Sequence, residues 1–201
     1  VSTAIDAAGI VYATWQDCRF EPSCNANDLV LTSSPNGTAW SPIVRIPLDP
    51  VASNTDHFIP GLTVAPSTAG SSARLGLSYY LYPVALCGSA CALLTGYAQS
   101  ADGGSTWSAT RSPFAGMALN SIAQTNQGRM VADYVATVFS MRGPVSIVAA
   151  SSPPSGATFE EATFAWSPRP SSMALAARSS RIYVRTRPAN HRAIRGPLET
   201  L

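Results

Sequence analysis

A small set of polar and aromatic residues has the chemistry needed to bind or cleave an anionic or hydroxyl-rich ligand. Arg19 and Arg129 would bind a carboxylate, because each guanidinium presents a fork of donors that matches two carboxylate oxygens. Asp17 or Asp133 would act as a general acid if burial raised the pKa of its carboxyl group. Tyr134 would act as a nucleophile if a nearby carboxylate accepted its phenolic proton.

Asp56 and His57 are further ligand-binding candidates, and Asp56 is a third candidate for the general acid. Every residue of this set also has an ordinary structural interpretation. His57, next to Phe58, would pack at a strand end, and we prefer that role to catalysis. Asp133 would cap a turn, Tyr134 would be half-buried, and Arg19 would form a surface ion pair of little energetic value.

Short β-strands separated by turn residues must position these side chains, and we therefore expect an all-β protein. The strands fall into about three units, expected at residues 1–50, 51–115 and 116–168. The expected strands are 9–15, 28–32 and 43–47 in the first unit, 59–64, 74–80, 92–99 and one near Ser112 in the second, and 130–139, 145–150 and 161–166 in the third.

The segment from Ser100 to Trp107 reads S-x-D-x-G-x-T-W, and its spacing has a local physical explanation. The Asp102 carboxylate would accept backbone N–H groups within a tight turn, and Gly104 would supply an unusual φ angle. Thr106 would bond the far end of the turn, and Trp107 would pack its apolar face on the sheet below. Five defined residues in a fixed order make this a specific motif, known as an Asp box.

A degenerate copy lies upstream when Trp40 is aligned with Trp107, a spacing of 67 residues (107 − 40). Ser33 and Gly37 then match the motif, whereas proline replaces its aspartate and alanine replaces its threonine. Self-similarity at a fixed period with four short strands per unit indicates β-propeller blades. Two unrelated hairpins that each end in tryptophan are the alternative, and a β-sandwich is a more distant one.

Connectivity predicts on which face of a propeller each loop emerges. If the strands of a blade are labelled a to d from the axis outward, connections b–c and d–a share one face, and a–b and c–d share the other. Both boxes are c–d turns, whereas both cysteine-containing loops are b–c connections. The ligand-binding candidates should therefore gather near one mouth of the axial channel: Asp17, Arg19, Glu21, Asp56, His57, Arg129, Asp133 and Tyr134.

Four cysteines form two close pairs, Cys18/Cys24 and Cys87/Cys91. The simplest interpretation is two local disulfides in a secreted or periplasmic protein, although four cysteines permit three pairings and free thiols are the alternative. Neither spacing matches a zinc framework, so we expect no metal and no cofactor.

Charge is distributed unevenly along the chain. Through residue 168 six arginines face ten acidic residues, whereas the tail 169–201 holds seven arginines and a single glutamate. We expect a poorly ordered or aberrant tail in preference to a nucleic-acid site, and no apolar run has the length of a membrane span. With no initiator methionine, the chain is expected to begin inside a longer protein or after processing.

Three further segments accompany the two boxes: 15–20, 56–61 and 128–134. Together they resemble the bacterial BNR-repeat, sialidase-like exported proteins over roughly residues 5–165. The resemblance implies a six-bladed sialidase-type propeller, of which this chain supplies about half and the rest of a parent chain the missing blades. The family's Phe/Tyr-Arg-Ile-Pro motif is matched only by Val44-Arg45-Ile46-Pro47, without the aromatic residue.

Two functions follow from this resemblance. The first is exo-α-sialidase hydrolysis of a glycan at the axial funnel, with Tyr134 as nucleophile, a nearby acid as acid/base, and Arg19 and Arg129 in the group that binds the sialate carboxylate. The second is a non-catalytic propeller that binds a glycan or a protein at the same mouth. Asp boxes occur in both classes and do not discriminate between them.

Overall fold

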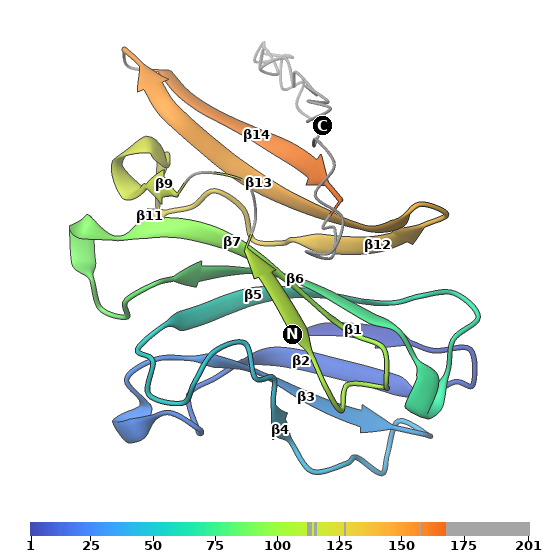
Figure 1. The fold of residues 1–201 in the computed structure, drawn as a ribbon. Coiled ribbons are helices and arrows are strands. Elements are labelled where there is room, and N and C mark those ends of the chain that lie inside the picture. Colours follow the sequence, from blue (N-terminus) through green and yellow to red (C-terminus); the bar gives the residue numbers. More distant parts are fainter. Residues whose placement is uncertain (112–113, 115, 127, 157, 168–201) are drawn as a thin grey trace, which may run out of the picture.

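A computed structural model describes residues 1–111, 114, 116–126, 128–156 and 158–167 (Figure 1). Within these ranges the chain contains β-strands and single-turn 3₁₀ helices but no α-helix, so the predicted all-β class is confirmed. The fourth strand expected near Ser112 is found just before it, at Ser108–Arg111, whereas Ser112 itself and the arginine-rich tail lie outside the described residues. No helix in the part of the chain that the structure describes has the length and apolarity needed to cross a bilayer.

The first sheet is an antiparallel meander in which consecutive strands are neighbours. Its strands are β1 (Ser2–Ile5), β2 (Val11–Asp17), β3 (Asp28–Ser34) and β4 (Val44–Arg45). The β2–β3 connection contains the 3₁₀ turn η1 (Pro22–Cys24). The predicted strands of this unit therefore correspond to β2, β3 and β4, and β1 precedes them.

The second sheet repeats this order and adds one short strand. It consists of β5 (Asp56–Val64), β6 (Leu75–Tyr82), β7 (Ala92–Ser100) and β8 (Ser108–Arg111), with β9 (Met117–Ala118) also paired to β7. The β5–β6 and β6–β7 connections contain η2 (Gly70–Ser72) and η3 (Gly88–Ala90). A β-bulge interrupts β5 between Phe58 and Gly61.

The third sheet has three antiparallel strands, β12 (Ala136–Ser140), β13 (Gly143–Ser155) and β14 (Thr158–Trp166). Before it come η4 (Leu119–Ser121) and a two-stranded hairpin of β10 (Gln124–Thr125) and β11 (Gly128–Arg129). The strand expected at 130–139 is shorter than predicted, because residues 130–135 form a connection that precedes β12.

The three larger sheets are stacked as layers, with the second (green) between the first (blue) and the third (orange) in Figure 1. Alternation along β6 creates the two interfaces: Leu75, Leu77 and Tyr79 pack in the core shared with the first sheet, whereas Tyr80 packs in the core shared with the third. The first strands of the three sheets also lie next to one another: β5, the first strand of the second sheet, contacts both β1 and β12. None of these sheets closes on itself.

The Asp box forms the β7–β8 turn with the predicted hydrogen bonds. Asp102 Oδ1 accepts from the Thr106 N–H at 2.8 Å, and Oδ2 accepts from its hydroxyl at 2.6 Å. Ser100 Oγ donates to Asp102 Oδ1 and accepts from the Gly104 N–H. Trp107 packs against the core between the first and second sheets, so the turn is attached to that interface as well as to its own sheet.

The corresponding turn of the first sheet corrects the alignment that was based on tryptophan. Ser34, rather than Ser33, ends β3 as Ser100 ends β7, and its Oγ accepts from the Gly37 N–H at 2.8 Å. Asn36, rather than residue 35, replaces the aspartate, because its Oδ1 accepts from both the backbone and the hydroxyl of Thr38. From its serine to its tryptophan the turn is one residue shorter than the intact box, so alignment on Trp40 misplaces the serine, aspartate and threonine positions by one residue, whereas Gly37 still matches Gly104.

Candidate functional site

The loops lie on two opposite edges of the stacked sheets, as connectivity predicted. On one edge the hairpin after β1 contacts the loop after β5: the Asp6 carboxylate accepts from the Gly70 N–H, and Ala73 accepts from the Gly103 N–H of the Asp box. On the other edge the loop after β2 contacts the segment before β5, where Glu21 accepts from the Ala52 N–H. This second edge carries five of the candidate residues: Asp17, Arg19, Glu21, Asp56 and His57.

Each pair of cysteines forms a local disulfide, as predicted. Cys18 is bonded to Cys24 and Cys87 to Cys91, and each bond closes the loop between the second and third strands of its sheet. The two disulfides are typical of a protein from an oxidising compartment. The Cys18–Cys24 bond closes the loop that contains Arg19 and Glu21.

Trp15, Asp17 and Arg19 form a connected group at the end of β2. Asp17 accepts from the indole N–H of Trp15 at 3.0 Å and forms an ion pair with Arg19 at 2.8 Å. Hydrogen bonds from Arg19 are the largest influence on the pKa of the Asp17 carboxyl and, with that of Trp15, lower it despite partial burial. A general acid needs the opposite shift, so Asp17 is suited to accepting hydrogen bonds as a carboxylate. Arg19 remains 48% exposed.

Of the adjacent candidates at the start of β5, His57 is buried and Asp56 is partly buried. Asp56 Oδ1 accepts from the backbone and side-chain N–H groups of Asn27 at 2.9 and 2.8 Å. His57 is 2% exposed, and burial lowers the pKa of its imidazole although Asp49 opposes the shift. The structure therefore supports the packed, strand-end interpretation of His57.

The remaining candidates lie in the connection between the second and third sheets. Arg129 donates to the Ile122 carbonyl oxygen at 2.7 Å, which holds this connection together. Tyr134 is 87% exposed, so it is not the half-buried residue that a structural role would require. Asp133 is exposed beside it. The three residues thus belong to a different connection from the Trp15–Asp17–Arg19 group.

Sequence reasoning missed a buried charged cluster centred on Arg45. Nη2 of Arg45 lies 2.7 Å from Oδ1 of both Asp28 and Asp49 and 3.9 Å from Glu21. His57 Nε2 lies 3.9 Å from Asp49 Oδ2. In the sequence Arg45 matches only an incomplete family motif, Val44-Arg45-Ile46-Pro47. The available signal was a strand-forming segment with a charged residue between two apolar ones, Val44 and Ile46.

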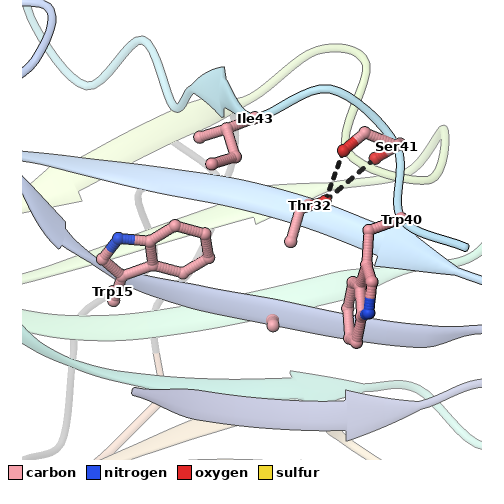
Figure 2. A pocket seen from close by; sticks show the side chains of 6 residues that line it. Trp15, Thr32, Trp40, Ser41 and Ile43 are labelled. Atoms are coloured by element: carbon pink, nitrogen blue, oxygen red, sulfur yellow. Dashed lines mark hydrogen bonds between the residues drawn. The ribbon is translucent and has the colours of Figure 1, made fainter. Parts of the chain in front are cut away.

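A hollow of about 390 Å³ lies on the face of the first sheet that points away from the second (Figure 2). Figure 2 shows Trp15 and Trp40 at its two ends with Thr32 between them. Thr32 Oγ1 donates to the Ser41 carbonyl oxygen at 2.7 Å, so the hydroxyl is satisfied and the surface of the hollow is mainly apolar. Trp40 is 46% exposed, unlike Trp107 of the intact box. Ala13 and Ile43 complete the lining.

Register equivalence shows why this face of the first sheet is hollow. Val11 pairs with Ser34 and Leu75 pairs with Ser100, so β2 and β6 can be aligned through their turns. The packed face of the second sheet then carries Leu75, Leu77, Tyr79 and Leu81, and the equivalent positions of the first carry Val11, Ala13, Trp15 and Asp17. Ala13 therefore stands where the second sheet has Leu77, and the ionised Asp17 stands where it has Leu81.

No family model matches the chain, and no curated protein matches it. The functional inference therefore depends on the contacts described above.

Proposed function

We propose that the chain is a non-catalytic glycan-binding module, with its ligand lying along the hollow face of the first sheet. The observation that carries this proposal is that an apolar hollow lies next to an exposed ion pair on the same face. Trp40, Ala13 and Trp15 line the hollow, and Asp17 and Arg19 form the ion pair beside Trp15. Binding sites for small ligands typically combine a mostly apolar surface with a few polar groups that set orientation.

Glycans match both parts of this surface. The C–H face of a pyranose ring is apolar and flat, so it stacks on an indole, whereas the ring's hydroxyl groups need polar partners. Trp15 would provide the stacking surface, and the ionised Asp17 would accept hydrogen bonds from sugar hydroxyls. Arg19, half-exposed, would bind the carboxylate of an acidic sugar through its paired donors. We therefore infer a preference for acidic glycans.

Sialidase-type hydrolysis remains a prediction that receives less support from the geometry. It needs a protonated acid and a tyrosine whose phenolic proton a carboxylate can accept. Asp17 is held as a carboxylate, and Arg129 is bonded to a backbone carbonyl of its own connection. Tyr134 is largely in solvent, in a different connection from Asp17. Glycan binding without hydrolysis needs neither the protonated acid nor the activated tyrosine.

We also propose that the three stacked sheets are blades of the sialidase-type propeller and that the protein is exported. The support is the intact Asp box, its shortened copy in the first sheet, and the contact of β5 with both β1 and β12. The two disulfides support export, because such bonds persist in oxidising compartments. Closure of the ring would require further blades.

A second role for the hollow face follows from the same repeat. The equivalent face of the second sheet packs against a neighbouring sheet, so the face of the first sheet would do the same in a closed propeller. Ala13 and the ionised Asp17 favour ligand binding over packing of another sheet. A packed sheet would leave the space beside Ala13 unfilled and would bury the charge of Asp17, and both effects are costly.

The test is a glycan array probed with the full chain, followed by titration of the best ligand into single variants. We expect Trp15→Ala and Trp40→Ala each to weaken binding at least tenfold, since stacking would be lost. Tyr134→Ala is the matched control, because it removes an exposed aromatic side chain outside the hollow. Binding that survives both tryptophan substitutions, or a folded chain that binds no glycan, contradicts the proposal and favours the sheet-packing role.

A further inference from the structure

Three residues from separate segments bring metal-binding atoms together beneath the second edge. Asp28 begins β3, Asp49 lies between β4 and β5, and His57 is the second residue of β5. One potential ligand atom from each lies within 4.8 Å of the others. Asp28 and His57 are each 2% exposed, so this arrangement belongs to the interior.

The charges of this region do not balance. Glu21, Asp28 and Asp49 supply three carboxylates, whereas Arg45 supplies one permanent positive charge. Excess negative charge in a buried position is costly unless a cation or a proton offsets it.

Asp28 provides a second, independent observation. Its Oδ1 is bonded to Arg45, but its Oδ2 is buried and has no hydrogen-bond partner among the described residues. A buried carboxylate oxygen without a partner loses its hydration without replacement, which is rare in folded proteins. Asp28 is one of the three residues of the group, so a cation bound there would give this oxygen a partner.

The neighbouring contacts would orient all three ligands. Arg45 Nη2 donates to Oδ1 of Asp28 and of Asp49. Oδ2 of Asp28 is left without a partner, whereas Oδ2 of Asp49 accepts from the Ser53 hydroxyl at 2.5 Å and would keep a lone pair for a cation. Nδ1 of His57 lies 3.4 Å from the Asn27 carbonyl oxygen, and its Nε2 points toward Asp49 Oδ2 at 3.9 Å. A neutral imidazole that donates through one nitrogen and offers the other is typical of metal-binding histidines.

We propose that Asp28, Asp49 and His57 form a binding site for a divalent cation of the zinc class. One nitrogen and two carboxylate oxygens suit Zn²⁺, whereas Ca²⁺ and Mg²⁺ prefer oxygen ligands alone. Bonds of roughly 2.0–2.2 Å require the three side chains to move inward by roughly 1 Å, and Asp49, 18% exposed, has room to do so. The ion would connect β3 with β5 and thereby link the first and second sheets.

The test measures Zn²⁺ bound to the chelator-treated full chain by equilibrium dialysis and elemental mass spectrometry. We expect one Zn²⁺ per chain and at least tenfold weaker binding in Asp49→Asn and in His57→Gln. Asp133→Asn is the matched control, because it removes an exposed carboxylate outside the cluster and should bind Zn²⁺ like the wild type. All four cysteines are in disulfides and therefore do not compete for the metal.

A second measurement is needed in case either variant fails to fold. Nuclear magnetic resonance provides it, because it uses a chain in which Asp28, Asp49 and His57 are all unchanged. The chain has two histidines, and His191 lies outside the described residues, so His191→Gln leaves a single imidazole. We expect Zn²⁺ to shift the His57 ring nitrogen resonances at one equivalent, and Ca²⁺ to leave them unchanged. Unshifted resonances, binding that survives in folded Asp49→Asn and His57→Gln, or a preference for Ca²⁺ would overturn the proposal.

Discussion

Arg45 and Asp28 form a buried ion pair, with Nη2 of the arginine 2.7 Å from Oδ1 of the aspartate. Burial opposes the charge of Arg45, but the attraction of Asp28 and Asp49 is stronger, and the net effect raises the pKa of the guanidinium. The pair joins β4 to β3 at the edge where the second sheet begins. Because both side chains are buried, the loss of either one would leave the charge of the other without compensation.

Replacement of Arg45 by alanine should lower the free energy of unfolding by about 3–5 kcal/mol, because Asp28 would remain buried without its partner. The measurement is urea denaturation followed by circular dichroism. Arg142→Ala is the control, since Arg142 is exposed and its loss should change stability by less than about 0.5 kcal/mol. Equal effects of the two substitutions would show that the buried pair contributes nothing specific.

Gly104→Ala should destabilise the chain more than Gly37→Ala. Both glycines have left-handed φ angles, +95° and +75°, so both substitutions introduce backbone strain of about 1 kcal/mol. Only at Gly104 would the added Cβ meet a neighbour, Leu31 Cδ2 of the first sheet at 2.5 Å, which adds roughly 1–3 kcal/mol of overpacking. Thermal unfolding of the two variants tests this difference, and similar melting temperatures would contradict it.

Asp102 should make stability depend on acid pH. Hydrogen bonds from the Thr106 hydroxyl and N–H are the main reason that the pKa of Asp102 is lowered to about 2. The unfolded chain has the ordinary value of about 3.9, so this contribution is complete above about pH 5 and is lost as the pH falls toward 2. Melting temperatures of the wild type and Asp102→Asn should therefore converge over that range. A constant difference from pH 7 to pH 2 would disprove this linkage.

Tyr80→Phe should weaken the contact between the second and third sheets. The Tyr80 hydroxyl donates to the Ala149 carbonyl oxygen at 2.7 Å and accepts from the Ala149 N–H at 3.1 Å, and burial raises the pKa of the phenol to about 12. Its removal leaves buried polar groups of β13 unsatisfied, at a cost of about 1–3 kcal/mol. Tyr82→Phe, in the same strand but half-buried, is the control and should change the free energy of unfolding less.

Arg19→Lys should distinguish acidic from neutral glycan ligands. Lysine keeps the positive charge but lacks the paired donors of the guanidinium, so affinity for a carboxylated glycan should fall about tenfold. Affinity for a neutral glycan that stacks on Trp15 should change little. Isothermal titration of both ligands into both proteins gives the comparison, and equal losses would mean that Arg19 does not recognise the carboxylate.

Local features were predictable from the chain alone because their determinants are close together in sequence. The bonds of Asp102 to Thr106 span four residues, and each disulfide closes a short loop, so their spacing carries the information. Strand positions followed from turn residues for the same reason. The shortened turn at Asn36 was misaligned because one conspicuous residue, Trp40, was used as the reference.

The sequence by itself determined the all-β class, the order of the strands and the intact Asp box, and it favoured the two local disulfides that the structure contains. Only the tertiary structure decided which polar residues share a site. It placed His57 with Asp28, Arg45 and Asp49 in a buried cluster, and it separated Arg129 from Arg19. These contacts join residues from different strands and loops, and their partners depend on how the sheets stack. Packing between sheets is a long-range outcome of many weak contacts, and no short motif encodes it.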